Sequence, residues 1–336
     1  MAKKWLVIDS HNHYFPAEVL PKLGTADGMD YAAMAAGRVT QCYRWGVSLE
    51  RTVQVMDEAG VDMTLLNQST WSPMGLEVCQ KLNHAYASVA RDYPSRFICC
   101  AQVPLDGSAR TLREVDRARN ELGLQAMSLV TSTTEMTLDS EKLFPLWEKL
   151  SRLDMPVVVH PTTRTPLWGA ASYILNAGVA REYDCAKATV EVLDVVLQRF
   201  PDLHFLMPHH GGGMPLLKGR VMARFEPEGW NVPLDIKGLA KTPRELQELG
   251  LDKAFDQYFD KLYFDTAGFS GWMPITEAIV KVVRTDRICF GTDYPFEIHT
   301  ARDVKLFIEG IKKLPITETE KRGILGENLK RFLKLK

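Results

Sequence analysis

The stretch WLVIDSHNHYFP, residues 5–16, decides the fold class. Its apolar run at 5–9 predicts a short buried strand, and a polar turn that carries His11 and His13 follows at once. An open sheet that binds a dinucleotide would place a GxGxxG turn at this point. The turn that is present therefore argues against a dinucleotide-binding protein.

Seven further apolar runs, each followed by turn residues, predict strands at 63–67, 97–103, 126–130, 156–160, 203–209, 262–266 and 288–293. The segments between them have helical spacing, as in SLERTVQVMDEAG at 48–60. Strands that alternate with helices are parallel and are joined by right-handed crossovers. Eight such units predict an α/β fold, a (β/α)8 TIM barrel, with residues 1–336 as a single domain. A doubly wound open sheet is the alternative.

Two segments are longer than a minimal barrel needs. Residues 14–47, rich in aromatic, Gly and Met residues, separate the first strand from its helix and predict a small lid. Residues 224–260 separate strands six and seven. Loops of this length often cover a site or form an interface. Beyond about residue 300 we expect two amphipathic helices that pack against the barrel.

The composition narrows the class of protein. The 41 basic residues nearly cancel the 42 acidic ones, for a formal net charge of -1, so neither nucleic acid nor an anionic membrane is expected as a partner. The six cysteines form no CxxC pair and mostly lie in apolar runs, which is typical of buried thiols in a reducing compartment. With no signal-peptide pattern and no apolar run of about 20 residues, we expect a cytoplasmic enzyme.

Polar residues gather where the predicted strands end, and a barrel builds its active site at this edge. His11 and His13 follow strand one with one residue between them, so an extended backbone points both rings to one side. His160 ends strand five and Asp293 ends strand eight. Imidazoles and a carboxylate suit zinc, with one position left open, and manganese, iron and cobalt also fit. The convergence predicts one divalent ion held by these four residues.

Each ligand candidate also has a purely structural interpretation. A lone His-x-His is often only loop chemistry, Asp293 in GTDYPF can accept hydrogen bonds from loop amides, and His160 can be a satisfied histidine at a strand end. Their coincidence at matching strand ends favours the metal site.

The run HHGGGMP at 209–215 is a second local signal. Three glycines let the backbone come close to a ligand, although a plain tight turn would also use them. We predict His210, which abuts the glycines, as the acid/base group, and His209 as the last residue of strand six.

The pattern resembles the amidohydrolase superfamily, and within it the branch that contains the decarboxylase of 2-amino-3-carboxymuconate 6-semialdehyde. The matching motifs span almost the whole chain: DSHNHYFP at 9–16, VVVHP at 157–161, HGGGMP at 210–215 and FGTDYPF at 290–296. The resemblance implies metal ligation by His11, His13, His160 and Asp293, with Asp293 and His210 as the catalytic residues.

The resemblance also implies features outside the ligand set. Many hydrolytic members carry a carboxylated lysine after strand four that bridges two metals, and AMSLVTSTT at 126–134 has no lysine, which argues for one metal. Members of the decarboxylase branch hold the substrate carboxylate with an arginine after strand one, for which Arg38 is the candidate and Arg44 and Arg51 are rivals. Arg220 resembles an arginine that reaches a neighbouring subunit's active site, which implies a homodimer or a higher homo-oligomer.

Nonoxidative decarboxylation of a small aromatic or unsaturated carboxylic acid is the favoured hypothesis, with the metal as Lewis acid. Candidates for an apolar wall around the substrate are Trp168, Phe296, Tyr14, Phe15 and Tyr294. Hydrolysis or hydration, in which metal-bound water attacks a C=O or C=C bond, is the first alternative. A catalytically silent barrel that binds a ligand or metal for structure or sensing is the second.

Overall fold

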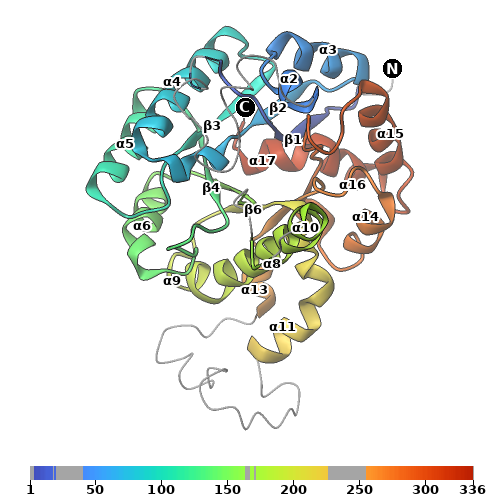
Figure 1. Cartoon of the computed structure of the whole chain (residues 1–336). Coiled ribbons are helices and arrows are strands. Elements are labelled where there is room, and N and C mark those ends of the chain that lie inside the picture. Colours follow the sequence, from blue (N-terminus) through green and yellow to red (C-terminus); the bar gives the residue numbers. More distant parts are fainter. Residues whose placement is uncertain are drawn as a thin grey trace.

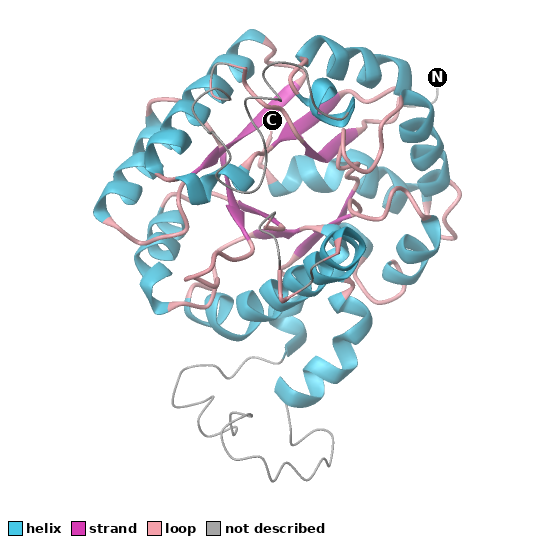
Figure 2. Ribbon diagram, viewed as in Figure 1, coloured by secondary structure: helices cyan, strands magenta, loops and turns pink. Residues whose placement is uncertain are grey.

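The computed structural model describes residues 4–17, 19, 41–162, 167–169, 172–225 and 255–335. Within them, eight parallel strands form a ring surrounded by helices, which Figure 2 shows in magenta and cyan. The predicted (β/α)8 barrel is confirmed.

The strands follow one another around the ring in chain order. Backbone hydrogen bonds from Ser10 N to Phe290 O, at 2.8 Å, and from Asp293 N to His11 O, at 2.9 Å, link the end of the chain of strands to its beginning. The strands are β1 (Ile8–Asn12), β2 (Met63–Leu66), β3 (Phe97–Gln102), β4 (Ala126–Val130), β5 (Val157–His160), β6 (Phe205–Met207), β7 (Tyr263–Asp265) and β8 (Ile288–Cys289).

Helices connect the strands and cover the outside of the ring, as Figure 1 shows. The helices are α2 (Gln41–Gly46), α3 (Leu49–Ala59), α4 (Leu76–Asp92), α5 (Ala109–Asn120), α6 (Phe144–Arg152), α7 (Tyr173–Leu175), α8 (Arg181–Glu191), α9 (Leu197–Arg199), α10 (His209–Gly212), α11 (Lys218–Phe225), α13 (Phe255–Phe259), α14 (Met273–Ile279), α15 (Ala301–Lys312), α16 (Glu318–Arg322) and α17 (Asn328–Phe332).

Local chemistry explains where these helices begin and end, and α3 is an example. The side chain of Ser48 accepts a hydrogen bond from the amide of Arg51 and so caps the first turn. Gly60 ends the helix with φ of 80°, a left-handed conformation that glycine adopts without strain.

An apolar cluster fills one end of the barrel. It takes residues from all eight strands, together with Leu329, Phe332 and Leu333 at the end of the chain, where α17 packs under the ring. Apolar side chains fill this end of the barrel. The polar side chains lie at the opposite end, where the strands terminate, which is where barrel enzymes have their active sites.

A bulge in β1 decides which of its residues face the interior. Ile8 packs in the interior cluster, and strict alternation would send every second residue after it inward, which excludes His11 and His13. The pairing register with β2 shifts between Asp9 and Asn12, where β1 has one residue more than its partner. The extra residue reverses the alternation, so both histidines face the interior.

Some boundaries differ from the prediction. The first strand was expected at 5–9 and lies at 8–12, because pairing with β2 begins at Ile8. Residues 18 and 20–40 of the predicted lid, and 226–254 of the second long segment, lie outside the described residues. Beyond residue 300 there are two helical stretches, as predicted: α15, and the continuous stretch 318–332 in which a π-helical turn at 323–327 joins α16 to α17. Across the described ranges, no helix has the length and apolar character needed to span a bilayer.

Candidate metal centre

Side chains from separate strands meet at the carboxyl end of the barrel. His11 lies in β1 and His13 directly follows it, His160 ends β5, and Asp293 follows β8. His209, two residues after β6, joins them. All five are buried. The structure thus brings the four predicted ligands together and adds a fifth side chain.

The ligand atoms are closely spaced. Nε2 of His13 lies 3.0 Å from Oδ1 of Asp293 and 3.3 Å from Nε2 of His160. Nε2 of His11 and Nε2 of His209 each lie 3.8 Å from an oxygen of the same carboxylate. The ligand atoms of His11, His13 and His160 all lie within 4.8 Å of one another.

Two ring nitrogens of this cluster indicate that a cation belongs there. Nε2 of His11 and Nε2 of His209 are buried and have no hydrogen-bond partner among the described residues. Leaving such a polar atom unsatisfied costs about 1–3 kcal/mol. A divalent ion accepts lone pairs from imidazole nitrogens and a carboxylate oxygen, so the residues present fit such an ion.

Hydrogen bonds on the far side of each ring orient the ligands. Nδ1 of His11 lies 2.8 Å from Oδ2 of Asp265. Nδ1 of His13 and Nδ1 of His160 lie 3.0 and 2.7 Å from backbone carbonyl oxygens. Because these acceptors require a hydrogen on Nδ1, the lone pair of each neutral ring is left on Nε2, toward the centre of the cluster.

Burial and charge set the protonation states. Burial would raise the pKa of Asp293, but the close contact with His13 and the electrostatic effect of His11, His13 and His209 lower that pKa to about 2. Burial lowers the pKa of His160 well below its ordinary value, and the neighbouring imidazoles lower it further. Burial would also lower the pKa of His11, but Asp265 outweighs it and raises that pKa. An ionised carboxylate and a neutral imidazole are metal-binding forms, so a metal ion and a proton compete for the ring of His11.

Asp265, the last residue of β7, is a residue of the site that the sequence analysis missed. Besides holding His11, its Oδ1 accepts hydrogen bonds from the amides of His209, at 2.8 Å, and Ala267, at 3.1 Å. Its signal was a carboxylate at a strand end, in LYFDT at 262–266, the same signal that singled out Asp293.

We expect Asp265→Asn to weaken metal binding about 10–100-fold, because an amide nitrogen replaces one of the oxygens that orient His11 and the turn at His209. Competition with a chelator of known affinity measures this. Asp202→Asn, at an exposed carboxylate, is the control and should leave the affinity unchanged. Equal affinities for Asp265→Asn and the wild type would contradict the role of Asp265.

A left-handed turn explains why His209 reaches the cluster. β6 ends at Met207 because Pro208 has no amide hydrogen to continue the ladder. His209 and His210 have φ of 53° and 51°, and the three glycines at 211–213 also have positive φ. The prediction that His209 ends strand six is therefore wrong, because it begins the turn.

The structure places His210 away from the cluster. Its Nε2 lies 3.4 Å from Oγ1 of Thr276 on α14, and its ring packs 5.7 Å from the ring of Phe269. Burial lowers its pKa to about 4, and it belongs to no ligand group formed by the described residues. Nε2 of His209, by contrast, lies 3.8 Å from an oxygen of Asp293.

His209 also has the more basic environment. Burial would lower its pKa, but the carboxylates of Glu182, Asp293 and Asp265 outweigh burial and raise the pKa to about 9. Nδ1 of His209 lies 2.7 Å from Oε1 of Glu182 on α8. A protonated imidazole that points at the cluster is suited to donate a proton there.

Gly268, in the loop after β7, makes room for the His209 ring. Its φ is 79°, and a Cβ at this position would overlap the imidazole. We expect Gly268→Ala to lower the free energy of unfolding by about 1–3 kcal/mol through overpacking, in addition to the cost of a left-handed alanine. Denaturant unfolding measures the change.

Gly123→Ala is the matched control, since Gly123 has φ of 72° and nothing within 4 Å of an added Cβ. Gly123→Ala introduces the same strain of a left-handed alanine as Gly268→Ala, but its Cβ clashes with no neighbouring atom. If both variants lose the same stability, Gly268 has no steric role at the ring.

The predicted apolar wall is partly in place. The ring of Phe296 lies 5.3 Å from the ring of His13 and 5.9 Å from that of Phe15, beside the ligands. Trp168 is 50% exposed and packs edge-on against Tyr183 at 5.4 Å.

The predicted arginines are less well placed by the structure. Arg38 lies outside the described residues. Arg44 is exposed on α2, and Arg51 on α3 lies 5.7 Å over the ring of Trp45. Arg220 is exposed on α11.

The end of β4 holds a hydrogen-bonded carboxylate in place of a lysine. The hydroxyl of Ser132 lies 3.1 Å from both oxygens of Asp184 on α8, and Thr131 donates to the same carboxylate. Asp184 belongs to no candidate ligand group within the described ranges.

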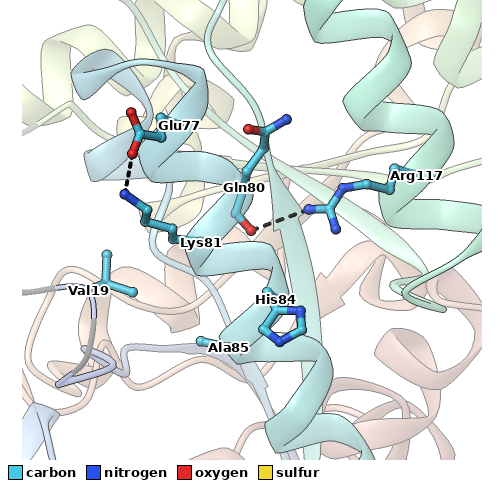
Figure 3. A pocket seen from close by; sticks show the side chains of 7 residues that line it. All are labelled: Val19, Glu77, Gln80, Lys81, His84, Ala85 and Arg117. Carbon is cyan, nitrogen blue, oxygen red and sulfur yellow. Dashed lines mark hydrogen bonds and ion pairs between the residues drawn. The ribbon is translucent and has the colours of Figure 1, made fainter.

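A surface hollow on α4 is separate from the cluster. Figure 3 shows an ion pair between Glu77 and Lys81 and a hydrogen bond from Arg117 to the carbonyl of Gln80. These contacts already engage its charged side chains, so it is a weaker candidate site than the barrel mouth. The lining residues are Val19, Glu77, Gln80, Lys81, His84, Ala85 and Arg117.

Comparisons with known proteins find a matching family and several relatives. A family model described as amidohydrolase matches residues 8–335. The 2-amino-3-carboxymuconate-6-semialdehyde decarboxylase of Dictyostelium discoideum is 28% identical over 264 residues, which cover 77% of this chain and 67% of that protein. A 2-keto-4-carboxy-3-hexenedioate hydratase of Sphingobium is 24% identical and covers 97% of this chain and 95% of its own length.

A solved structure has the same fold. The 5-carboxyvanillate decarboxylase of Novosphingobium aromaticivorans superposes with a TM-score of 0.80 at 20% identity, covering 98% of this chain and 96% of that one. That structure was solved with manganese and 4-hydroxy-3-methoxy-5-nitrobenzoic acid.

Proposed function

We propose, on the premise that this chain belongs to the amidohydrolase family, that it is a metal-dependent decarboxylase of a small aromatic or unsaturated carboxylic acid. The observation that carries the proposal is the convergence of His11, His13, His160 and Asp293 with a separate imidazole, that of His209, whose buried Nε2 has no partner within the described residues. Metal ligands plus an independent proton donor are what this reaction needs.

Different residues of the site would have different roles in the reaction. A divalent cation held by the four ligands would supply the positive charge that polarises the substrate. When the carboxylate leaves as CO₂, the electron pair of the broken C–C bond stays on the substrate carbon. Nε2 of His209 gives that carbon its proton. Phe296, beside His13, would pack against the substrate's flat face.

The finer features of the site are also proposals. We propose zinc as the ion, because imidazole nitrogens and one carboxylate oxygen suit it, with manganese, the ion in the similar carboxyvanillate decarboxylase structure, as the nearest alternative. We retain Arg38 as the clamp for the substrate carboxylate, by a bidentate pair.

We further propose a homodimer, in which Arg220 reaches the neighbouring subunit. Exposed apolar side chains support it, two of them directly before α11, because apolar surface on a protein often marks an interface. They lie on α7, α8 and the turns beside them: Tyr173, Ile174, Leu175, Val179, Tyr183, Leu216 and Leu217.

Gas release distinguishes decarboxylation from its rival. We expect zinc- or manganese-loaded protein to release CO₂ from at least one acid in a panel of hydroxybenzoates, 5-carboxyvanillate and muconate-type acids. The relative named as a hydratase supports the alternative, addition of water to a C=C bond. A product formed from the panel without CO₂ would reject the decarboxylase in favour of the hydratase.

A further inference from the structure

We propose that Glu182, on α8, is a positioning residue that holds the ring of His209 with its Nδ1 hydrogen toward the helix and its Nε2 toward the metal centre. This inference rests on the proposed role of His209 as proton donor. The contact between Oε1 of Glu182 and Nδ1 of His209 is 2.7 Å long, and both side chains are largely buried. A carboxylate only accepts, so the shared hydrogen belongs to Nδ1.

The turn at 209–213 is built to bring these two side chains together. A Cβ at Gly212 would overlap the carbonyl oxygen of Glu182 and lie 2.6 Å from the amide nitrogen of Ala186. Only glycine lets the turn lie directly on the first turns of α8, and its left-handed φ of 61° suits glycine as well. This backbone contact therefore fixes the position of Glu182 relative to the imidazole of His209.

Contacts on other sides of the ring fix its remaining freedom. The amide of His209 donates to Asp265, and the backbone at Gly268 lies against the ring. A ring turned by 180° would place a carbon opposite Glu182 and forfeit the 2.7 Å hydrogen bond. The carboxylate is thus the group that selects one of two ring orientations and one tautomer.

The ring nitrogen of His209 that does not contact Glu182 points into the site. Nε2 of His209 has no hydrogen-bond partner in the described part of the chain and lies 3.8 Å from Asp293. To donate a proton to the substrate from Nε2, His209 must first bind that proton there, which requires a lone pair on Nε2 in the neutral ring. Without Glu182, the single hydrogen of the neutral ring could lie on Nε2 instead of Nδ1, and Nε2 would then have no lone pair.

The test is Glu182→Gln in the zinc-loaded full-length protein, with Glu148→Gln, at an exposed carboxylate on α6, as control. Long-range ¹H–¹⁵N spectra of histidine-labelled protein report the tautomer of each ring, and the signals of His209 are assigned by their loss in His209→Asn. The spectra are recorded at a pH above the pKa of the His209 ring, where the ring is neutral. We expect the Nδ1–H form in the wild type and in the control, and a mixture with the Nε2–H form in Glu182→Gln, because an amide both donates and accepts.

Kinetics provide the second readout. For whichever acid of the panel releases CO₂, kcat should fall about 10–100-fold in Glu182→Gln, with KM and zinc content unchanged. Glu182→Ala should show the same split if the substitution leaves the protein folded, which thermal unfolding checks.

An unchanged His209 tautomer in both Glu182 variants would overturn the inference, as would a loss of zinc, which would mark Glu182 as part of the metal site. The spectra need no substrate. If no acid is decarboxylated, the proposed function fails while the tautomer still decides the role of Glu182.

Discussion

Replacing His209 by asparagine is expected to lower kcat for CO₂ release about 10²–10⁴-fold, the usual contribution of a positioned acid or base. Nε2 of His209 is the one unpartnered imidazole nitrogen of the described cluster that is not on a predicted ligand. Asparagine tolerates the left-handed conformation found at this position, so the backbone of the turn should survive. Steady-state kinetics with metal analysis measure the effect, and the metal content should stay at the wild-type level.

His210→Asn is the matched control, because it places the same side chain at the adjacent left-handed position. We expect it to keep kcat within a few-fold of the wild type, although the loss of a buried ring lowers stability by roughly 1–3 kcal/mol. The opposite ranking, with His210→Asn inactive and His209→Asn active, would restore the assignment made from the sequence and reject the one made from the structure.

Removing the metal is expected to abolish CO₂ release altogether. Three imidazoles and a carboxylate gather at the carboxyl end of the barrel, and without a cation the negative charge that develops as CO₂ leaves loses the strongest counter-charge in the site. Chelator-treated, dialysed protein should be inactive, and zinc or manganese should restore activity. His160→Ala should bind little metal and resist this rescue, because it deletes a ligand.

His84→Ala is the control for the ligand variant, since His84 is an exposed imidazole on α4. It should keep both its metal and its activity. Full turnover by chelated, metal-free protein would contradict the assignment of the reaction to a metal enzyme.

The sequence predicted the architecture because barrel strands are buried on both faces and appear as continuous apolar runs. All eight runs overlap the observed strands. Their ends were predicted less well, because pairing determines them. β1 begins where Ile8 meets β2, and β6 stops before Pro208. Neither the partner strand nor the register is visible in a local apolar pattern.

The four predicted ligands came together because residues at strand ends share one edge of a barrel, whatever their separation in the chain. The choice between His209 and His210 depends on local backbone geometry. Adjacent residues differ in direction only through backbone φ and ψ, and the left-handed turn at 209–213 could not be read from the glycines alone. Glu182, whose carboxylate reaches the ring from α8, carried no motif of its own.

Anomalous X-ray diffraction at the zinc edge, from crystals grown with zinc, tests the metal centre most directly. We expect one strong peak per chain at bonding distance, about 2.0–2.2 Å, from Nε2 of His11, His13 and His160 and from an oxygen of Asp293. A peak held instead by Glu182, Cys185 and His209, which also form a group of potential ligands, would contradict the proposed site, as would an empty cluster in zinc-soaked crystals.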